Sequence, residues 1–398
     1  MENRSVTVRP DNCCGCGACR AVCPVGAVSM TEDEYGFVMP KTDLARCIGC
    51  GRCVSVCSFL TPEKHLSGSL PIKAYAAVNR DEKLLKRSSS GGVFAGAARA
   101  VLNSGGAVYG AAMGKDFSVK HIGIDSENSL RRIQGSKYTQ SDTSEVFSSV
   151  KEKLASGRRV LFSGTPCQAA ALKAYLGDGH EGLYIIDLVC HGVSSNRLFK
   201  EDIACLSRRY GSPVRAVLFR SKRRPRGAWG ELVLESGIKE YSPLTSPYYY
   251  YYYAAGSILR DSCHHCPYAQ RKRVGDMTVG DFWRIETLFR GGGMNTGKGV
   301  SCLMVNTPKG MELLDMFREQ FMLREVGYEE IVKRNGNLRG HCKADKKRDK
   351  LLELYRRKGY GAVASYYRAN ERKNVAILKL RGIIPTRLKT ALKRKLLK

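Results

Sequence analysis

The sequence is poor in acidic residues and has no long apolar run. Only 37 of its 398 residues are Asp or Glu, against 66 Lys and Arg, so the formal net charge is +29. No apolar stretch approaches the ~20 residues that a membrane-spanning helix needs, and Met1 to Arg4 do not open a secretory signal. The 16 cysteines favour a reducing cytoplasm over a disulfide scaffold. We expect a cytoplasmic protein of two or three domains.

Eight of the cysteines form two runs with the same spacing near the start of the chain. Each run is Cys-x2-Cys-x2-Cys-x3-Cys, the pattern of two-cluster bacterial ferredoxins, in which the fourth cysteine of a run binds the other cluster. Zinc sites usually take two separate Cys-x2-Cys pairs instead. The additional Cys14 is expected to bind nothing. We predict one 4Fe–4S cluster on Cys13, Cys16, Cys19 and Cys57, and a second on Cys47, Cys50, Cys53 and Cys23.

Residues 1–60 are therefore predicted to form an α+β ferredoxin-like dicluster domain, with a strand at residues 5–8 and a hairpin at residues 28–39. Beyond the linker, strand-like and helix-like segments alternate, which indicates a larger α/β domain. The expected strands are 74–78, 107–112, 119–124, 160–162, 183–189 and 300–305, and the expected helices are 93–102, 142–156, 166–176 and 196–209. We divide the rest of the chain into a linker (61–72), an N-terminal part (73–155), a C-terminal part (156–345) and a basic helical tail (346–398).

Two motifs in the larger domain lie at the starts of predicted helices, where a ligand could bind. Ser88 to Gly92 precedes a helix, whose free N–H groups could hold a phosphate of a flavin, although an ordinary capped loop has the same sequence features. Ser163 to Gln168 follows a buried strand, with Thr165 as a helix cap and Pro166 in the first helical position. Cys167 then lies in the first turn, where the helix dipole favours the thiolate, unless it is only a small buried residue.

Four further cysteines could form a third site. Cys190 ends a predicted strand at the carboxyl edge of the sheet, where ligand sites of α/β folds collect. Cys263-His264-His265-Cys266 is a Cys-x2-Cys knuckle, which could instead bind zinc with help from its histidines. We interpret Cys167, Cys190, Cys263 and Cys266 as ligands of a third 4Fe–4S cluster. No partner spacing is evident for Cys205, Cys302 or Cys342, and Cys302 is expected in the core.

Several other segments have two readings. Gly280-Asp281-Phe282-Trp283 could line a planar cofactor or simply end a strand. The six tyrosines from Tyr248 to Tyr253 are expected on a helix, some in the core and some exposed. The basic loop 222–226 could be solvated or could contact an acidic partner. The amphipathic basic segment 375–398 could lie on an anionic membrane or pack on the domain.

At these motifs the chain resembles a known family. Ser88–Gly92, Gly135-Ser136-Lys137-Tyr138, Ser163–Gln168, Cys190-His191-Gly192, Cys263–Pro267 and Gly280–Trp283 look like the beta subunit of coenzyme F420-reducing hydrogenase and formate dehydrogenase. The resemblance covers roughly residues 73–340, and an N-terminal two-cluster module is a common fusion in that family.

The resemblance implies a flavin-binding α/β domain that holds FAD and a further 4Fe–4S cluster. It also implies electron exchange between a deazaflavin coenzyme and the clusters. By motif, the flavin contacts would be Ser89, Gly91, Gly92, Lys137, Tyr138, Gly164 and Thr165, and the third cluster would use the four cysteines named above.

We therefore expect an iron–sulfur flavoprotein oxidoreductase that passes electrons between a hydride-carrying coenzyme, FAD and the 4Fe–4S clusters. One alternative is a ferredoxin-dependent flavin reductase that acts on an organic substrate in bacterial polysaccharide biosynthesis. Another is a non-catalytic electron-relay subunit. The basic charge suggests an acidic redox partner or a polyanionic coenzyme, and an oxidoreductase partner subunit is a further possible partner. No nucleic-acid module is recognisable, and no nucleic-acid partner is expected.

Overall fold

The computed structural model describes residues 12–223, 229–289, 294, 297–371 and 376. The strand expected at residues 5–8 and nearly all of the basic segment 375–398 lie outside these residues. The strands are β1 (Val28–Glu32), β2 (Val38–Thr42), β3 (Lys73–Asn79), β4 (Ala107–Met113), β5 (Val119–Ile124), β6 (Val160–Gly164), β7 (Leu183–Leu188), β8 (Val214–Leu218), β9 (Gly230–Leu234), β10 (Gly237–Tyr241), β11 (Met277–Asp281), β12 (Ser301–Val305) and β13 (Phe321–Glu325). The α-helices are α1 (Ala18–Ala21), α2 (Arg52–Ser55), α3 (Glu82–Arg87), α4 (Val93–Asn103), α5 (Val146–Ala155), α6 (Pro166–Leu176), α7 (Asn196–Tyr210), α8 (Pro308–Asp315), α9 (Tyr328–Arg334) and α10 (Arg348–Asn370).

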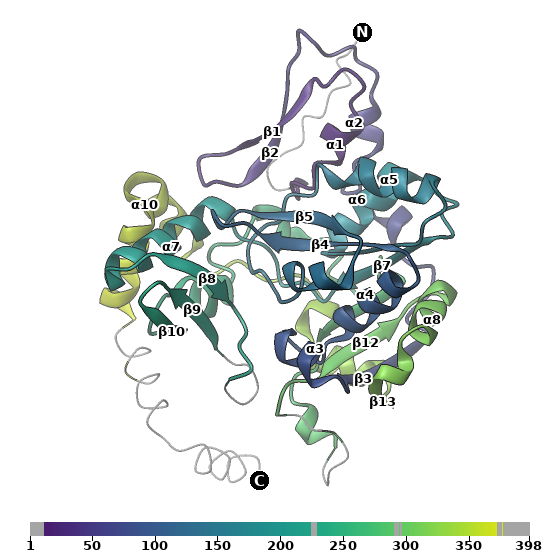
Figure 1. Cartoon of the computed structure of the whole chain (residues 1–398). Helices are drawn as coiled ribbons and strands as arrows, with labels where there is room; N and C mark the ends of the chain where they lie inside the picture. Colours follow the sequence, from purple (N-terminus) through teal and green to yellow (C-terminus); the bar gives the residue numbers. More distant parts are fainter. Residues whose placement is uncertain (1–11, 224–228, 290–293, 295–296, 372–375, 377–398) are drawn as a thin grey trace.

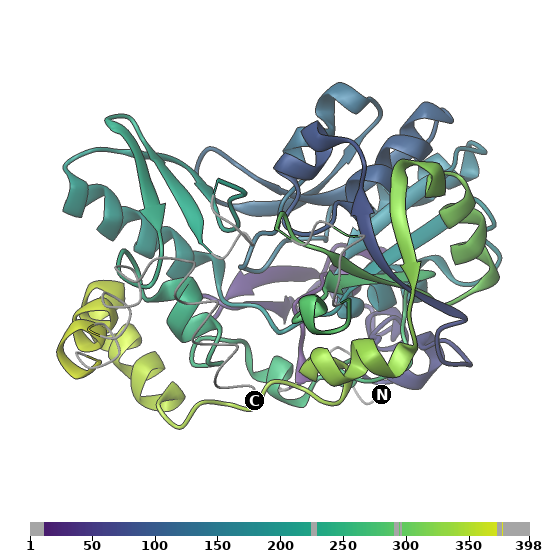
Figure 2. The ribbon, with the colours of Figure 1, turned by 90° about the horizontal axis from the view of Figure 1, so that it is seen from below.

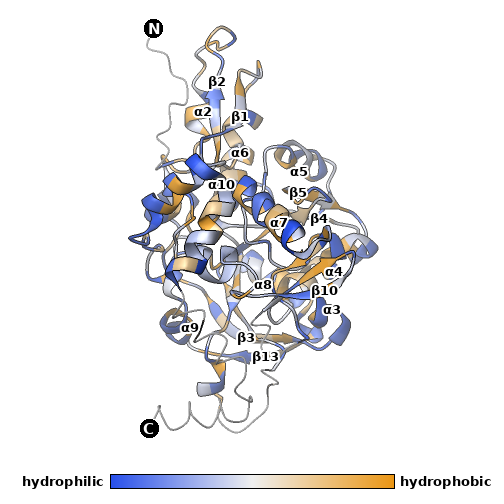
Figure 3. Ribbon diagram, turned by 90° about the vertical axis from the view of Figure 1, so that its left-hand side faces the viewer, coloured by the Kyte–Doolittle hydropathy of each residue, from blue (hydrophilic) through white to orange (hydrophobic). Residues whose placement is uncertain are grey.

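Residues 12–61 form a small module, called here the ferredoxin-like module. Its strands β1 and β2 pair as an antiparallel hairpin, as expected from the sequence, and its short helices α1 and α2 follow the two cysteine loops. Figures 1 and 3 place this module at one end of the molecule, opposite β3 and β13. Ala18 and Val56 of the module belong to the same apolar cluster as Val146 and Phe147 of α5, so the module packs directly on the larger domain.

The larger domain is built on a mixed sheet of eight strands in the order β13-β3-β12-β11-β7-β6-β4-β5. The central strands β4, β6, β7 and β11 are parallel, and the strands toward each edge are antiparallel. The sheet crosses the sequence division at residues 155 and 156, because β4 pairs with β6. The carboxyl ends of the parallel strands therefore meet at one edge, where the sequence placed Thr165 and Cys190.

The buried strands are apolar on both faces because helices cover both sides of the sheet. In β6, Val160 and Phe162 pack toward α5 and α6, whereas Leu161 packs toward α4 and α8. The same alternation holds along β7, where Ile185 and Ile186 face opposite layers. The expected helices and strands of residues 73–210 are present, and Cys302 is fully buried in β12 as expected.

A second, smaller core lies beside the large sheet. The antiparallel strands β8, β9 and β10 pack with α7, α10 and the tyrosine run, and Figures 1 and 2 show this group on one side of the large sheet. The tyrosines form a π-helix, Tyr248–Tyr253, with Tyr248, Tyr252 and Tyr253 buried and the other three half-buried. Helix α10 is kinked at Gly359, where φ is +70°. No helix within the described residues is long and apolar enough to cross a bilayer.

Candidate electron-transfer site

The structure brings together the two crossed cysteine sets of the ferredoxin-like module. One cavity, the proximal cavity, is lined by Cys13, Cys16, Cys19 and Cys57 together with Cys14 and Phe59. A second, the distal cavity, is lined by Cys23, Cys47, Cys50 and Cys53 together with Ile48 and Arg52. The fourth cysteine of each run therefore joins the other run's cavity, which is the arrangement that two 4Fe–4S clusters require.

Glycines with left-handed backbone conformations shape these loops. Gly15 and Gly17 have φ of +65° and +77°, and Gly49 and Gly51 have φ of +66° and +70°. The turns direct backbone N–H groups toward sulfur: the N–H of Gly15 donates to Cys13 Sγ at 3.3 Å. Such bonds stabilise thiolates and tune the potential of a bound cluster.

The donor set fits an extended cluster better than a single metal ion. The described residues include no group of three or more His, Cys, Asp or Glu side chains placed to hold one metal ion. A 4Fe–4S cluster instead needs thiolates spread around a larger group, and the linings of the two cavities include cysteines but no His, Asp or Glu. The residues present therefore fit the clusters that the spacing implies.

A third thiol-lined cavity, the inner cavity, lies in the larger domain. Its lining includes all four cysteines proposed from the sequence as the third-cluster ligands, and also Cys14, Cys342, His191, Arg260 and Arg273. The four proposed ligands are Cys167, Cys190, Cys263 and Cys266. Neither His264 nor His265 lines this cavity, and His264 Nδ1 lies 2.9 Å from the carbonyl oxygen of Cys342. This placement disfavours the zinc knuckle in which the two histidines assist.

Local structure explains how these thiols converge. Cys167 lies in the first turn of α6, which Thr165 and Gln168 close with a reciprocal capping box, and Thr165 Oγ1 lies 3.1 Å from Cys167 Sγ. Cys190 follows β7 at the carboxyl edge of the sheet, and Cys263 lies in the 3-10 helix Asp261–His265. Elements from three parts of the chain thus meet at one edge.

The four thiols are buried, which disfavours their thiolate forms unless a metal cluster is bound. Burial raises the pKa of Cys263 and of Cys266 to about 12 and raises that of Cys190 well above its usual range. Hydrogen bonding with Cys14, opposed by burial and assisted by Thr165, lowers the pKa of Cys167. Buried thiolates are costly unless positive metal ions compensate them, so binding of a cluster would release protons.

Cys14 and Cys342, which the sequence assigned to no site, both lie beside the thiol sets, and the expectation that Cys14 binds nothing stays a prediction. Cys14 lines both the proximal and the inner cavity, so its side chain lies between the two sets of thiols. Cys342 lines the inner cavity, with its Sγ 3.6 Å from His191 Nε2. Neither residue has a spacing that could have revealed this, because the contacts of each come from distant parts of the chain.

The predicted flavin contacts lie mostly around one cavity, called here the cofactor cavity. It has a volume of about 300 Å³, and its lining includes six of the seven residues, namely Ser89, Gly92, Lys137, Tyr138, Gly164 and Thr165. Gly91 is the exception. A Cβ at Gly91 would lie 2.0 Å from the carbonyl oxygen of Ala77, so this glycine allows β3 and β12 to approach the loop and does not line the cavity.

Lys137 is an unusual feature of the cofactor cavity. Its Nζ donates to the carbonyl oxygen of Gln134 at 2.9 Å, and burial alone lowers its pKa to about 7. Across the described residues, no carboxylate forms an ion pair with it. A buried cation with only a carbonyl partner is costly, and an anionic ligand in this cavity would offset that cost.

Other residues shape the walls of the cofactor cavity. The ring of Tyr138 stacks on Tyr249 with centroids 4.1 Å apart. His121 also lines the cavity, and burial lowers its pKa to about 4, which keeps the ring neutral. Asp281 lines the cavity and pairs with Arg220 at 2.8 Å, whereas Trp283 is 51% exposed and lies outside the lining.

The basic loop of the sequence analysis begins beside the cofactor cavity. Lys222 Nζ donates to the carbonyl oxygen of Ser90 at 2.8 Å and also contacts the carbonyl oxygen of Lys298. Residues 224–226 of this loop lie outside the described residues. Lys222 therefore supports the loop that precedes α4.

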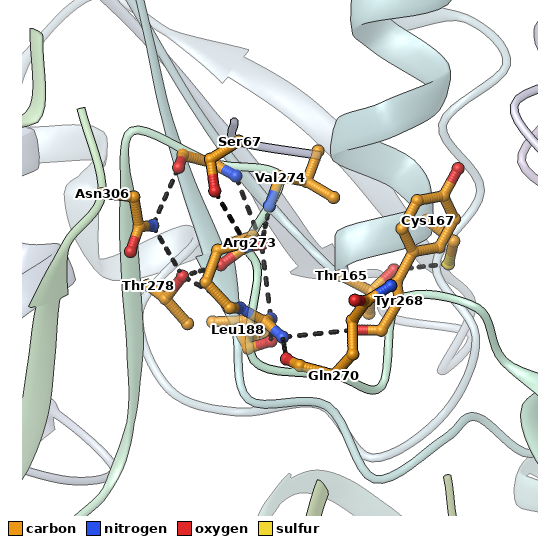
Figure 4. Close-up of polar contacts among 12 residues, drawn as sticks. Ser67, Thr165, Cys167, Leu188, Tyr268, Gln270, Arg273, Val274, Thr278 and Asn306 are labelled. Atoms are coloured by element: carbon orange, nitrogen blue, oxygen red, sulfur yellow. Dashed lines mark hydrogen bonds and ion pairs between the residues drawn. The ribbon is translucent and has the colours of Figure 1, made fainter. Parts of the chain in front are cut away.

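A buried ion-pair network stands behind the inner cavity. Figure 4 shows Arg273 surrounded by oxygen atoms from Tyr268, Gln270, Leu188 and Thr278. Its Nη2 also lies 3.4 Å from Asp187 Oδ2, with both side chains almost fully buried. This pair links β7 to the loop that precedes β11, and the ends of these two strands support the inner and cofactor cavities.

Comparison with known proteins finds a match for each of the two parts of the chain. Residues 157–330 match the family model for the C terminus of the beta subunit of coenzyme F420 hydrogenase/dehydrogenase, and residues 12–61 match the model "4Fe-4S dicluster domain". A component of the F(420)H(2) dehydrogenase of Methanosarcina mazei is 26% identical over 215 residues, which are 49% of this chain and 59% of that protein. This chain therefore aligns with less than two thirds of that relative.

A solved structure is also similar. A chain in the F420-reducing [NiFe] hydrogenase complex from Methanosarcina barkeri aligns with a TM-score of 0.46 and 17% sequence identity, over 67% of this chain and 91% of that chain. The two family models carry the assignment, and the resemblance predicted from the six motifs is confirmed. Residues 12–61 thus resemble a 4Fe–4S dicluster domain, and residues 157–330 resemble the C terminus of the beta subunits of coenzyme F420 hydrogenases and dehydrogenases.

Proposed function

We propose that the protein is an iron–sulfur flavoprotein oxidoreductase that exchanges electrons between a hydride-carrying coenzyme of the F420 type and 4Fe–4S clusters. One observation supports this most: the cavities adjoin in series. Thr165, Cys190, His191, Gly192 and Val193 line both the cofactor cavity and the inner cavity. Cys14 and Phe59 line both the inner and the proximal cavity. The distal cavity lies next in the ferredoxin-like module, where Cys19 of the proximal set packs in one apolar cluster with Cys23 and Cys53 of the distal set.

The cofactor cavity suits a flavin in its charge and its backbone. A bound flavin would link two-electron hydride chemistry to the one-electron chemistry of the clusters. Gly92 caps α4 with φ of +84°, and this helix N-terminus can hold a phosphate. Lys137 would place its charge next to the bound cofactor. The name of the Methanosarcina mazei relative suggests reduced F420 as the hydride donor.

For the electron partner we propose an acidic redox protein that docks on the distal loop of the ferredoxin-like module. Cys50 is exposed there, and Leu44 and Ile48 are 62% and 63% exposed. Arg46 and Arg52 are exposed beside them. Weak redox complexes combine a small apolar contact with complementary charge. We place these reactions in the cytoplasm, where free thiols and clusters persist.

Cofactor content tests the proposal directly. Protein purified without oxygen should contain about 12 iron atoms in three clusters and one FAD. Cys263→Ala should lose about four irons, whereas Cys205→Ala should lose none, because Cys205 lines none of the three thiol cavities. Oxidation of reduced F420 with electrons passed to ferredoxin would support the enzyme. Failure to bind either FAD or FMN would leave only an electron relay.

Lys137 offers a second test that does not need turnover. Its pKa is about 7 in the folded protein against an ordinary 10.5, so the unfolded chain holds more protons between these values and stability of the flavin-free protein rises as pH increases across this window. Lys137→Met should raise the melting temperature of the flavin-free protein at pH 6 and weaken FAD binding. A variant that binds FAD as tightly as the original would remove Lys137 from the proposed site.

A further inference from the structure

Arg260 is among the most deeply buried side chains of the molecule, at 1% exposure, and it lies where the ferredoxin-like module meets the larger domain. Its Nη1 donates to the carbonyl oxygen of Cys13 at 3.0 Å. Its Nη2 donates to the carbonyl oxygen of Val38 at 2.8 Å and to Gln140 Oε1 at 2.7 Å. Arg260 therefore joins the first cysteine loop and β2 to the larger domain.

The charge of Arg260 is not balanced by a carboxylate in the described part of the chain. Its partners are carbonyl oxygens, an amide oxygen, the sulfur of Met39 and the ring of Phe37, and its Nε has no hydrogen-bond partner. Arg273 is equally buried but pairs with Asp187. An unbalanced guanidinium in such a site is costly, so its surroundings should include a negative group.

Arg260 is close to two of the three thiol sets. It contacts Cys13 of the proximal cavity and is part of the lining of the inner cavity. The N–H of Cys263 donates to the backbone carbonyl of Arg260 at 3.0 Å. The charge of Arg260 therefore lies beside both sets of thiols.

We propose that Arg260 sets the reduction potentials of the two clusters that flank it, the proximal cluster and the inner cluster. This proposal rests on the clusters of the proposed function. An electron that passed from an inner cluster to a proximal cluster would oxidise the first and reduce the second. A fixed positive charge beside both would stabilise the reduced state of each, so it would raise both potentials together and change the difference between them little. In this scheme Arg260 is a positioning residue, because it acts on the clusters through its charge and is not one of their ligands.

Potentiometric titrations followed by EPR spectroscopy test the proposal. In Arg260→Gln, the potentials of both flanking clusters should fall by at least 59 mV, which is tenfold in a one-electron equilibrium. The distal cluster serves as an internal reference and should shift by less than half as much. Arg260→Lys keeps the charge and should shift the flanking clusters far less than Arg260→Gln does.

Gln140→Glu tests the same charge without changing Arg260. The new carboxylate would lie at the position that is now 2.7 Å from Arg260 Nη2, and it should lower both flanking potentials even if Arg260→Gln fails to fold. Unchanged flanking potentials in Gln140→Glu and Arg260→Gln would overturn the proposal. So would an equal shift of all three clusters, or an Arg260→Lys variant that shifts as far as Arg260→Gln or loses its clusters. An unmodified protein with fewer than three clusters would instead refute the proposed function.

Discussion

The two cysteine loops of the ferredoxin-like module have the same spacing and nearly the same backbone, yet their surroundings differ. Gly15 and Gly49, at equivalent positions 34 residues apart, have φ of +65° and +66°. A Cβ on Gly15 would meet Gln140 Nε2, the carbonyl oxygen of Val38 and Arg260 Nη2 at 2.5–2.8 Å, whereas a Cβ on Gly49 would meet nothing within 4 Å. One loop is docked on the larger domain, and the other is open.

The same contrast extends to side chains. Thr143 Oγ1 donates to the carbonyl oxygen of Cys16 at 2.7 Å, and Arg20 Nη1 donates to Ser144 Oγ at 2.9 Å, so polar contacts fix the docked loop. Cys14 is enclosed between two cavities, and its equivalent in the open loop, Ile48, is 63% exposed. Local sequence thus sets the shape of each loop, but contacts with the larger domain distinguish the docked loop from the open one.

The largest effect should come from adding a methyl group to the two equivalent glycines. Both Gly15→Ala and Gly49→Ala strain a left-handed residue by about 1–2 kcal/mol. Gly15→Ala adds a clash at the docked surface and should lower stability by more than about 4 kcal/mol and lose about four irons. Denaturant unfolding and iron analysis measure both. Equal destabilisation of the two variants would show that docking adds nothing to the first loop.

The order in which a chelator removes iron should show the next largest difference between the two loops. Because Cys50 of the distal cavity is exposed and the larger domain covers the proximal and inner cavities, a chelator added to oxidised protein should remove about four of the 12 irons first. EPR of the remaining clusters should then show the distal signal gone. Earlier loss of a flanking cluster would contradict the contrast between an open and a docked loop.

The sequence predicted much of this architecture because its signals are local. The paired cysteine runs predicted the crossed thiol sets, apolar runs bounded by turns predicted β6 and β7, and the helix α6 was expected between them. The strands β8 to β10 were not assigned, because their burial is mixed and β10 is mostly exposed. Such strands lack the strong apolar pattern on which sequence interpretation depends.

The parts of the site that could not be predicted depend on contacts between residues that are far apart in the sequence. Arg260 contacts Cys13, 247 residues earlier, and nothing in the sequence around it distinguishes it from an exposed arginine. Cys14 joins the proximal and inner cavities only because α6 packs on α1, which brings Cys167 near it. Spacing can reveal ligands within one loop, but it cannot show which distant residues line the same cavity.

A single hydrogen bond at the docked surface should give a smaller effect. Tyr268 is buried, and its hydroxyl donates to the carbonyl oxygen of Ser58 at 2.6 Å. Tyr268→Phe leaves that carbonyl unsatisfied and should lower stability by about 1–3 kcal/mol. Ile48→Ala on the open loop is the control, and it should change stability by less than about 0.5 kcal/mol. A larger loss for Ile48→Ala would indicate that the open loop also packs against the protein.

Charge reversal on the open loop should have the smallest effect on the fold. Its effect should be confined to partner binding. Arg46→Glu with Arg52→Glu should leave stability nearly unchanged but raise the KM for an acidic ferredoxin several-fold, mainly at low salt, because these charges steer association. Lys83→Glu with Lys86→Glu makes the same change in charge on α3, far from the ferredoxin-like module. If both pairs raise the KM equally, the partner responds to the net charge of +29 and not to the open loop. An effect limited to the first pair, absent at high salt, would place the partner at the distal cluster.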